Sequence, residues 1–324
     1  MKNMLTLLKE RQNRNHLLHR KSEVLFAFLF LMAMVIFGSF ASPYFLTTRN
    51  LRNLLTLNIG MILLTFAQMY IILLGGVDLS VGSVVSMTSV ICATMMVEGN
   101  IGNWLLVIIL CLLASAAIGL VNGLLVTKGG LQPIIATLAT QTVFAGVALV
   151  ILPGPGGDIP SALTKFLTRG AGYAVPILFV LAFIVLAWII LNRTAFGRAI
   201  YAVGGNEQSA ESAGIHVDSV KIKTFILAAV FAGVAGLYLS IYSTSGNPLL
   251  GEPYTQRSIT AAVVGGALLT GGKGSAVGCV IGALILGIIT NLLNLMNINT
   301  YYQFVLQGVL LILTLSISAL RSRK

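Results

Sequence analysis

Ten apolar stretches recur along the 324 residues, and they constrain the fold more than any other feature of the sequence. A helix needs about 20 apolar residues to cross the hydrocarbon of a bilayer, and inside lipid every backbone polar group must find its partner within the protein. We therefore expect an all-α, polytopic membrane protein of about ten transmembrane helices. The expected spans lie near residues 23–41, 53–74, 79–97, 104–127, 132–152, 174–191, 222–243, 258–270, 275–295 and 301–320.

The composition agrees with this class and excludes several others. Charged residues make up only 9% of the chain, against about 25% in an average soluble domain. Cys92, Cys111 and Cys279 all lie inside apolar runs without paired spacing, so we expect neither a disulfide framework nor a metal site. The net charge of +11 comes from basic residues scattered at the ends of spans, which indicates membrane topology and no nucleic-acid partner.

The distribution of basic residues predicts that both termini are cytoplasmic. If the N-terminus is inside and the chain crosses ten times, fifteen Lys and Arg residues fall inside and five outside, as the positive-inside rule requires. The outer five are Arg49, Arg52, Lys165, Arg169 and Arg257. The inner fifteen are Lys2, Lys9, Arg11, Arg14, Arg20, Lys21, Lys128, Arg193, Arg198, Lys221, Lys223, Lys273, Arg321, Arg323 and Lys324.

The expected organisation is a cytoplasmic segment 1–22, a transmembrane domain 23–320 and a basic cytoplasmic tail 321–324. The first apolar run follows a basic head and ends in small residues, as a cleaved signal peptide does. We favour a signal anchor that is not removed. Cleavage would leave nine spans and would place the later basic loops on the wrong side of the membrane. Segment 1–22 itself fits either an amphipathic helix on an anionic leaflet or a solvated tail.

A long water-exposed segment, residues 192–223, interrupts the apolar chain. It carries four basic and three acidic side chains. Its centre is built as a short helix: Asn206 is a good N-cap, Glu207 and Glu211 fall near the positive end of the helix dipole, and Gly214 can adopt the left-handed C-terminal conformation. Such a capped helix is suited to being pushed by another protein, although an ordinary solvated loop is the alternative.

Two glycine-interrupted segments resemble one another and predict an internal repeat. Leu73–Met87 aligns without gaps with Leu269–Ala283, and each contains an apolar run, a Gly-Gly break and a helix that opens on a small residue. The two copies begin the third and ninth spans, and an even separation of six spans would give them the same orientation in the membrane. The wider blocks of four spans, two to five and seven to ten, are offset by five spans and would instead be inverted repeats. Both interpretations stay open, but broken spans in both halves indicate backbone that lines a pathway.

The polar residues inside the spans are mostly neutral. No Lys, Arg, Asp or Glu is expected at the middle of a span, which disfavours an ion- or proton-coupled carrier, and Asp78 is the one acid in the first break. For each single amide, hydrogen bonding between helices is the alternative to lining a route. The residues that we assign to a translocation pathway are Gln68, Gly75, Gly76, Asp78, Asn122, Gln141, Gly271, Gly272, Asn291, Asn294, Gln303 and Gln307.

Enzyme motifs are missing from the sequence. GGKGS at Gly271–Ser275 fails as a phosphate-binding loop, because Gly274 follows Lys273 where Ser or Thr is needed. We expect no catalytic residues and no cofactor, so any ATP hydrolysis must occur on another chain. GLVNG at Gly119–Gly123 and GCVIG at Gly278–Gly282 are GxxxG sequences, which are typical of close helix packing.

Several motifs together resemble a known family. They are GGVDLSVG at Gly75–Gly82, AFGRAIYAVGGNEQSAESAGIHV at Ala195–Val217, ITAAVVGGALLTGGKGSAVGCVIGALILG at Ile259–Gly287 and NLLNLMNINTYYQFVLQGVLLIL from Asn291 to Leu313. In order and register they are similar to the permease subunits of bacterial ABC importers of the ribose and monosaccharide type. An integral membrane enzyme and a coupled carrier are the competing interpretations.

The resemblance implies a multi-pass protein of the bacterial inner membrane that works with three kinds of partner. These are a second permease subunit, identical or paralogous, a cytoplasmic ABC ATPase and an extracytoplasmic solute-binding protein. It also implies that segment 192–223 is the coupling segment that seats in the ATPase, although Ser209 stands where the general pattern has Ala. The residues carried over to that role are Gly197, Arg198, Asn206, Glu207, Ala210 and Gly214.

The outer basic residues suggest how the binding protein docks. Basic residues outnumber the acidic Glu98, Asp158 and Glu252 on the predicted outer face, and charges at the rim of an interface set encounter rate and register. Anchoring to lipid headgroups is the alternative. We assign docking to Arg49, Arg169 and Arg257. The sequence leaves the solute itself open.

Overall fold

A computed structural model describes residue 25 and residues 27–322 of the chain. Within this range the chain is helical, and an isolated bridge between Gly156 and Gly246 is the one extended pairing. The predicted segment 1–22, residues 23 and 24 of the first span and residues 323 and 324 of the predicted tail lie outside the described part.

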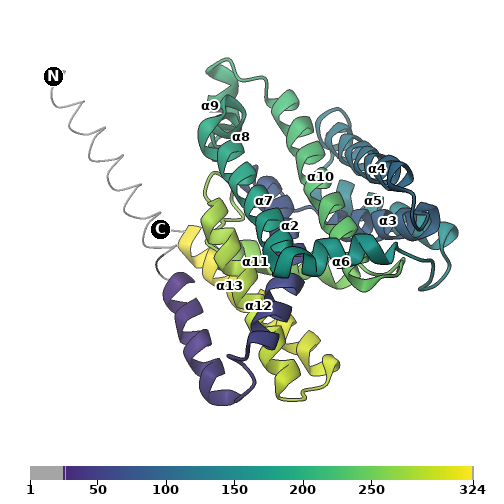
Figure 1. Cartoon of the computed structure of the whole chain (residues 1–324). Helices are drawn as coiled ribbons and strands as arrows, with labels where there is room; N and C mark the ends of the chain where they lie inside the picture. The colour runs from purple at the N-terminus through teal and green to yellow at the C-terminus, as the bar shows by residue number, and fades with distance from the viewer. Residues whose placement is uncertain (1–24, 26, 323–324) are drawn as a thin grey trace.

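Helices occupy all ten predicted regions (Figure 1). Six are long and apolar enough to cross a membrane, and three apolar helices are shorter, namely Ala27–Ala41, Val81–Met95 and Tyr301–Leu313. The all-helical membrane architecture is therefore confirmed, whereas the count of ten crossings stays a prediction. The helices in these regions are Ala27–Ala41, α2 (Thr48–Leu73), α3 (Val81–Met95), α4 (Ile101–Thr127), α5 (Pro133–Ile151), α7 (Ala174–Arg193), α10 (Val217–Ser243), α11 (Glu252–Val264), α12 (Ala276–Leu295) and α13 (Thr300–Ser322).

The predicted span 258–270 is wrong in its boundaries. Helix α11 begins at Glu252, with a proline in its first turn, and ends at Val264. Gly265 forms the C-cap and Gly266 has a φ of 92°, a left-handed conformation that readily terminates a helix. The stretch from Gly265 to Ser275 is consequently a loop between α11 and α12.

The structure contains a short amphipathic helix that was not predicted, α6 (Ser161–Arg169), followed by the 3-10 turn η1 (Gly170–Tyr173). The carboxylate of Glu98 accepts hydrogen bonds from the backbone and hydroxyl of Ser161 at the start of α6, where negative charge is favoured by the helix dipole. Thr164 donates to the carbonyl of Ile241, which holds α6 against the end of α10. Leu163 and Leu167, four residues apart, pack against the apolar cluster that contains Cys111. This helical spacing is visible in the sequence, but the helix is too short to resemble a membrane span.

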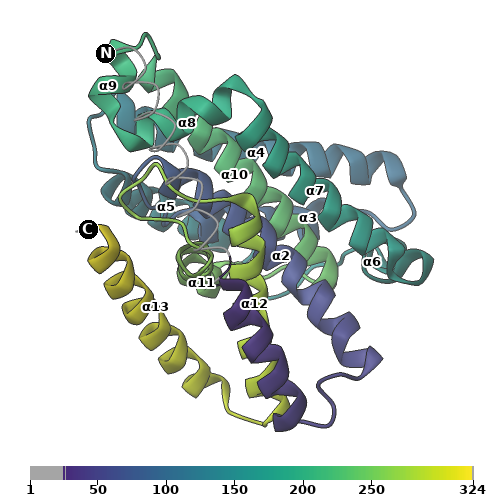
Figure 2. The same ribbon diagram turned by 90° about the vertical axis from the view of Figure 1, so that its left-hand side faces the viewer.

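Helix α2 forms the centre of the protein. Every residue from Asn58 to Leu73 is buried, and the helix passes through the middle of the bundle in both views (Figures 1 and 2). Phe66 and Tyr70 pack against Phe231 of α10, with ring centroids 6.0 Å and 5.5 Å apart. The Tyr70 hydroxyl donates to the carbonyl of Ala187 in α7 at 3.4 Å.

Both GxxxG sequences mark close helix contacts, as predicted. A Cβ added at Gly119 or Gly123 of α4 would overlap the backbone of α10, and one at Gly278 or Gly282 of α12 would overlap the end of α11. The absence of side chains lets the backbones approach, which is how small residues drive helix association in a membrane.

Candidate functional site

The middle of segment 192–223 folds into two short helices at one end of the molecule, α8 (Ala195–Gly205) and α9 (Glu207–Ser212) (Figures 1 and 2). The segment is shorter than predicted as a loop, because α7 continues to Arg193 and α10 already begins at Val217. The Asn206 side chain accepts a hydrogen bond from the backbone N–H of Ser209 at 2.7 Å, so it caps α9 as predicted. Gly214 follows the helix with a φ of 82° and closes it in the predicted left-handed conformation. Glu207 lies in the first turn, whereas Glu211 lies near the last residue and not at the positive end.

The coupling residues predicted by resemblance fall into two groups. Ala210 is 4% exposed and belongs to the main apolar core. Gly197 is buried where a Cβ would meet the last turn of α7. Arg198, Asn206, Glu207 and Gly214 are exposed. The first group can hold the two helices in place, and the second group is the part that another protein could contact.

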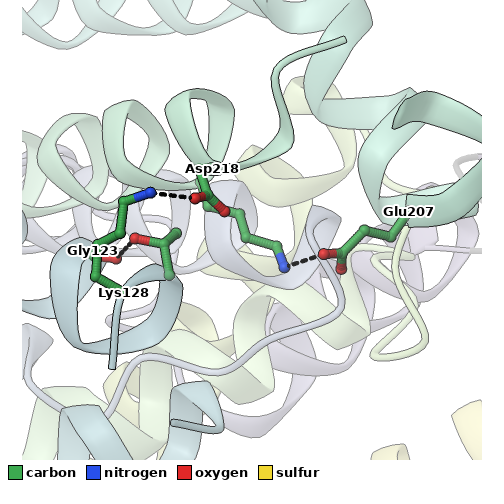
Figure 3. Close-up of polar contacts among 6 residues, drawn as sticks. Gly123, Lys128, Glu207 and Asp218 are labelled. Carbon is green, nitrogen blue, oxygen red and sulfur yellow. Dashed lines mark hydrogen bonds and ion pairs between the residues drawn. The ribbon is translucent and has the colours of Figure 1, made fainter. Parts of the chain in front are cut away.

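Two ion pairs tie this end of the molecule together (Figure 3). Lys221 of α10 lies 2.6 Å from the carboxylate of Glu207 in α9. Lys128, the residue that caps α4, lies 2.7 Å from Asp218 in the first turn of α10. One pair links α9 to α10 and the other links α10 to α4. Helix α9 is therefore connected through ion pairs to two membrane helices.

Both predicted Gly-Gly breaks meet at a third Gly-Gly pair, which stands directly before α9. The backbone N–H of Gly272 donates to the carbonyl of Leu73, the last residue of α2, at 2.9 Å. A Cβ at Gly204 would overlap that same carbonyl, and one at Gly271 would lie 2.9 Å from the nitrogen of Gly75. We call this contact of Gly75 with 204–205 and 271–272 the glycine junction; Gly76 instead lies against Pro133 of α5.

The glycine junction is also fastened by a side chain. The hydroxyl of Tyr201 in α8 donates to the carbonyl of Gly274 at 2.9 Å. Helix α8 is therefore held against the loop between α11 and α12 and against the end of α2 at one point. The sequence indicated the glycines at 75–76 and 271–272, but nothing in it showed that residues about 200 positions apart touch.

Three of the predicted pathway residues, Gln68, Asp78 and Asn122, are completely buried. One carboxylate oxygen of Asp78 accepts from the backbone N–H and the hydroxyl of Ser80, at 2.7 Å and 2.6 Å. Asn122 donates to the Ser80 hydroxyl and accepts from Thr140. With the nitrogen and oxygen of its side-chain amide exchanged, Gln68 donates to the backbone carbonyl of Asp78 and accepts from its backbone N–H. This network holds the break between α2 and α3 in shape.

Arg257, Asn291 and Asn294 line a different feature, a pocket of ≈ 190 Å³ between α2, α11 and α12. Its other polar lining residues are Asn58, Tyr254 and Thr290. Gln303 and Gln307 of α13 do not line the pocket but form hydrogen bonds with residues that do. Gln303 donates to Asn294, and the Nε of Arg257 donates to Gln307 at 2.9 Å. Asn291 exchanges two hydrogen bonds with Asn50 of α2. Gln141 lies apart, half-buried on α5.

The predicted docking arginines separate in the structure. Arg49 in the first turn of α2 and Arg169 at the end of α6 are exposed. Their elements are neighbours, because the guanidinium of Arg52 lies 4.8 Å from the ring centroid of Tyr173 in η1. Arg257 is instead half-buried within α11. Arg257 was expected between two spans, and this was wrong, because α11 begins earlier than expected and contains it.

Comparison with known proteins connects this architecture to transport. Residues 50–315 match the family described as branched-chain amino acid transport system / permease component. The chain is 40% identical over 300 residues to the ribose import permease protein of Bacillus subtilis (strain 168), covering 91% of this chain and 92% of the relative. It is 35% identical to the D-allose transport system permease protein of Escherichia coli (strain K12), covering 91% of each. It is 34% identical to the L-arabinose ABC transporter permease protein of Azospirillum brasilense, covering 90% and 86%. No solved structure matches the chain.

Proposed function

The chain belongs to the branched-chain amino acid transport system / permease component family, and we propose that it carries a monosaccharide or a similar neutral polar solute through the membrane as the permease subunit of an ATP-driven ABC importer. The observation that carries this proposal is the match over about nine-tenths of the chain to permeases named for ribose, D-allose and L-arabinose. ATP hydrolysis belongs to a separate subunit of such a system, so this chain is a transport subunit and not an enzyme.

The proposed orientation places α8 and α9 in the cytoplasm and the first turns of α2, with α6, on the outer side. Both termini are then cytoplasmic, and the domain boundaries are those expected from the sequence, 1–22, 23–320 and 321–324. The excess of basic residues at the α9 end supports this orientation. The membrane is the bacterial inner membrane, and ten crossings are part of the proposal.

The proposed coupling mechanism uses α9 as a lever. A cytoplasmic ABC ATPase would seat the exposed residues Arg198, Asn206, Glu207 and Gly214, while Gly197 and Ala210 keep α8 and α9 rigid. Closure of the ATPase on ATP would displace α9 together with α8. The glycine junction would pass that displacement to the end of α2 and to the loop before α12, because packed backbone transmits rigid-body motion.

The proposed pathway runs past the broken helices to the outer pocket. Gly75, Gly76, Gly271 and Gly272 stand at its inner end, and Asn291, Asn294, Gln303 and Gln307 at its outer end. Gln68, Asp78 and Asn122 support the first break, and Gln141, half-buried on α5, belongs to the same proposed route. A second permease subunit, identical or paralogous, is part of the proposed assembly. Asp78 is buried and bonded to Ser80 through one carboxylate oxygen. This fits structural support better than the alternative of an ion- or proton-coupled carrier, which needs an intramembrane group free to exchange its ion.

The extracytoplasmic binding protein is proposed to dock on Arg49 and Arg169. Both are exposed, Arg49 in the first turn of α2 and Arg169 at the end of α6, and α6 lies far from α9 in Figure 2. Rim charges there can set the register of an encounter. The test of the whole proposal is reconstitution of the permease with its ATPase and binding protein in proteoliposomes. ATP-dependent uptake of D-ribose, D-allose, L-arabinose or D-galactose is expected, and uptake that persists without ATP but follows a proton gradient would refute it.

A further inference from the structure

The pocket between α2, α11 and α12 contains a cation that has no acidic partner. Arg257 is half-buried within α11, and none of the described residues places a carboxylate within ion-pair distance of it. Its Nε donates to the neutral amide of Gln307, and its guanidinium lies 5.9 Å from the ring centroid of Tyr254. An ionised residue inside a membrane protein is costly and faces the interior or a water-filled cavity, where it marks a functional route.

A second polar group points into the same pocket without a partner. Asn58 is 3% exposed, and its amide nitrogen donates to the carbonyl of Leu54 at 2.7 Å. The amide oxygen accepts no hydrogen bond from the described residues. In the described part of the chain, the only fully buried side-chain N or O atom without a hydrogen-bond partner is the hydroxyl of Tyr238. Because the amide oxygen of Asn58 also lacks a partner, it must be partly accessible. The oxygen of Asn58 therefore opens on the pocket that Asn58 lines.

The space for this arrangement comes from a glycine. A Cβ at Gly287 of α12 would overlap the amide of Asn58, so Asn58 can lie between α2 and α12 only because position 287 lacks a side chain. Leucine and methionine side chains complete the wall. A mainly apolar cavity with a few convergent polar groups is the usual form of a small-molecule site.

The donors and acceptors of the pocket define the class of ligand. Arg257 offers N–H donors only, Asn58 offers an oxygen acceptor, and Thr290 offers a hydroxyl that does both. A hydroxyl-rich solute can satisfy all three, because each hydroxyl donates once and accepts twice. The volume of ≈ 190 Å³ corresponds to roughly six waters at ~30 Å³ each, which such a solute would replace.

We propose that Arg257, Asn58 and Thr290 form a solute subsite in the outer half of the permease, which holds a neutral polyhydroxylated molecule after the binding protein releases it. The subsite rests on the proposed function and assigns Arg257 to solute contact in place of docking. Tyr254 supplies an aromatic wall beside the guanidinium. The subsite gives the permease its own selection among solutes, in addition to that of the binding protein.

One experiment measures uptake and ATP hydrolysis together in the complete importer in proteoliposomes, with Arg257→Gln and Asn58→Leu. Loss of a hydrogen bond to a charged group should lower the solute moved per ATP by about tenfold, while ATPase activity stimulated by the binding protein is retained. Arg52→Gln is the matched control, because Arg52 is an exposed arginine on the same side that lies over Tyr173. Variants that transport like the wild type overturn the subsite.

A second experiment keeps Arg257, Asn58 and Thr290 intact. Leu57→Cys, at an exposed residue that lines the pocket, is introduced and labelled with a methanethiosulfonate reagent, which the buried native cysteines Cys92, Cys111 and Cys279 should resist. D-ribose, or whichever of the four sugars the wild type transports, should slow labelling at position 57. It should not slow labelling of Leu51→Cys, which is exposed on the same helix but does not line the pocket.

The outcomes separate the two proposals. If the wild-type importer moves none of the panel sugars, the proposed substrate class fails. If it moves one of them but that sugar does not protect Leu57→Cys, the subsite fails while the proposed function stands. Protection by ribose 5-phosphate and not by the neutral sugar would mean that Arg257 binds an anion, which also overturns the subsite.

Discussion

The ammonium group of Lys221 lies 2.6 Å from the carboxylate of Glu207, and this contact fixes α9 to α10. The Lys221 side chain is only 20% exposed, whereas that of Glu207 is 55% exposed. Glu207 therefore presents one side to α10 and the other to solvent, where a partner protein could reach it. Partly exposed pairs of this kind contribute about 0–1 kcal/mol to stability. The main effect of the pair is therefore to fix the position of α9, and its contribution to folding energy is small.

Charge reversal tests whether Glu207 acts through Lys221 or through the ATPase. We expect Glu207→Lys to abolish ATP-dependent uptake and to leave membrane insertion intact, because the change in folding energy is about 1 kcal/mol or less. Uptake and the amount of inserted protein are measured together. The double variant Glu207→Lys with Lys221→Glu restores the ion pair but should stay inactive; recovery of transport would place the role of Glu207 inside the permease.

The cap of α9 gives a prediction about backbone conformation. Gly214 has a φ of 82° and open space around it, so Gly214→Ala should cost about 1–2 kcal/mol through the left-handed backbone alone. Gly214→Pro also removes the N–H that donates to the Glu211 carbonyl at 2.9 Å, and uptake should be lost. Gly99→Ala introduces the same strain at φ 75° far from α9. Equal loss of uptake in Gly99→Ala would show a general folding defect.

The glycine junction predicts a sharp difference between two adjacent residues. Gly204→Ala places a methyl group into the Leu73 carbonyl, whereas Gly205→Ala meets nothing within 4 Å. Overpacking of this kind costs about 1–3 kcal/mol, so Gly204→Ala should lower the midpoint of thermal unfolding and uncouple uptake from ATP hydrolysis. Gly205→Ala should do neither. If the two variants behave identically, the glycine junction does not transmit the motion of α8 and α9.

The buried carboxylate of Asp78 distinguishes structural support from ion coupling. Asp78→Asn keeps an oxygen that can accept from Ser80, so uptake should be largely retained. Asp78→Ala leaves the Ser80 N–H and hydroxyl without their acceptor, at a cost of about 1–3 kcal/mol per unsatisfied group, and should lower thermal stability. Uptake and the unfolding midpoint are both measured. Complete loss of transport in Asp78→Asn with normal stability would favour an ion-coupled carrier.

The docking residues are tested by salt and by charge. Reversal of both Arg49 and Arg169 to Glu should raise the concentration of binding protein needed to stimulate the ATPase, and the wild-type requirement should itself rise with ionic strength, because salt screens exposed charges. Arg193→Glu, on the opposite side of the membrane in the proposed orientation, is the control. If the double variant is stimulated as the wild type is, these arginines do not dock the binding protein, and anchoring to lipid headgroups is their role.

Local features were predictable because their causes are local. The cap at Asn206, the left-handed Gly214 and the two GxxxG contacts each depend on a few neighbouring residues, and the structure confirms them. The boundaries of α11 were missed because its first turns are polar, with Glu252 and Arg257, and carry little hydropathy signal. Its helical structure and the pocket beside Arg257 arise from packing against α2, α12 and α13.

By itself the sequence determined that this is a helical membrane protein with a capped, water-exposed helix, because apolar length and cap chemistry are encoded residue by residue. The tertiary structure decided which helices are central. The more apolar α4 and α5 have 28% and 22% of their apolar windows buried, whereas the less apolar α2 has 89% buried. Lipid is as apolar as leucine, so hydropathy does not drive a membrane helix inward. Small residues, amides and backbone contacts such as that between Gly272 and Leu73 do so, and only the folded chain brings them together.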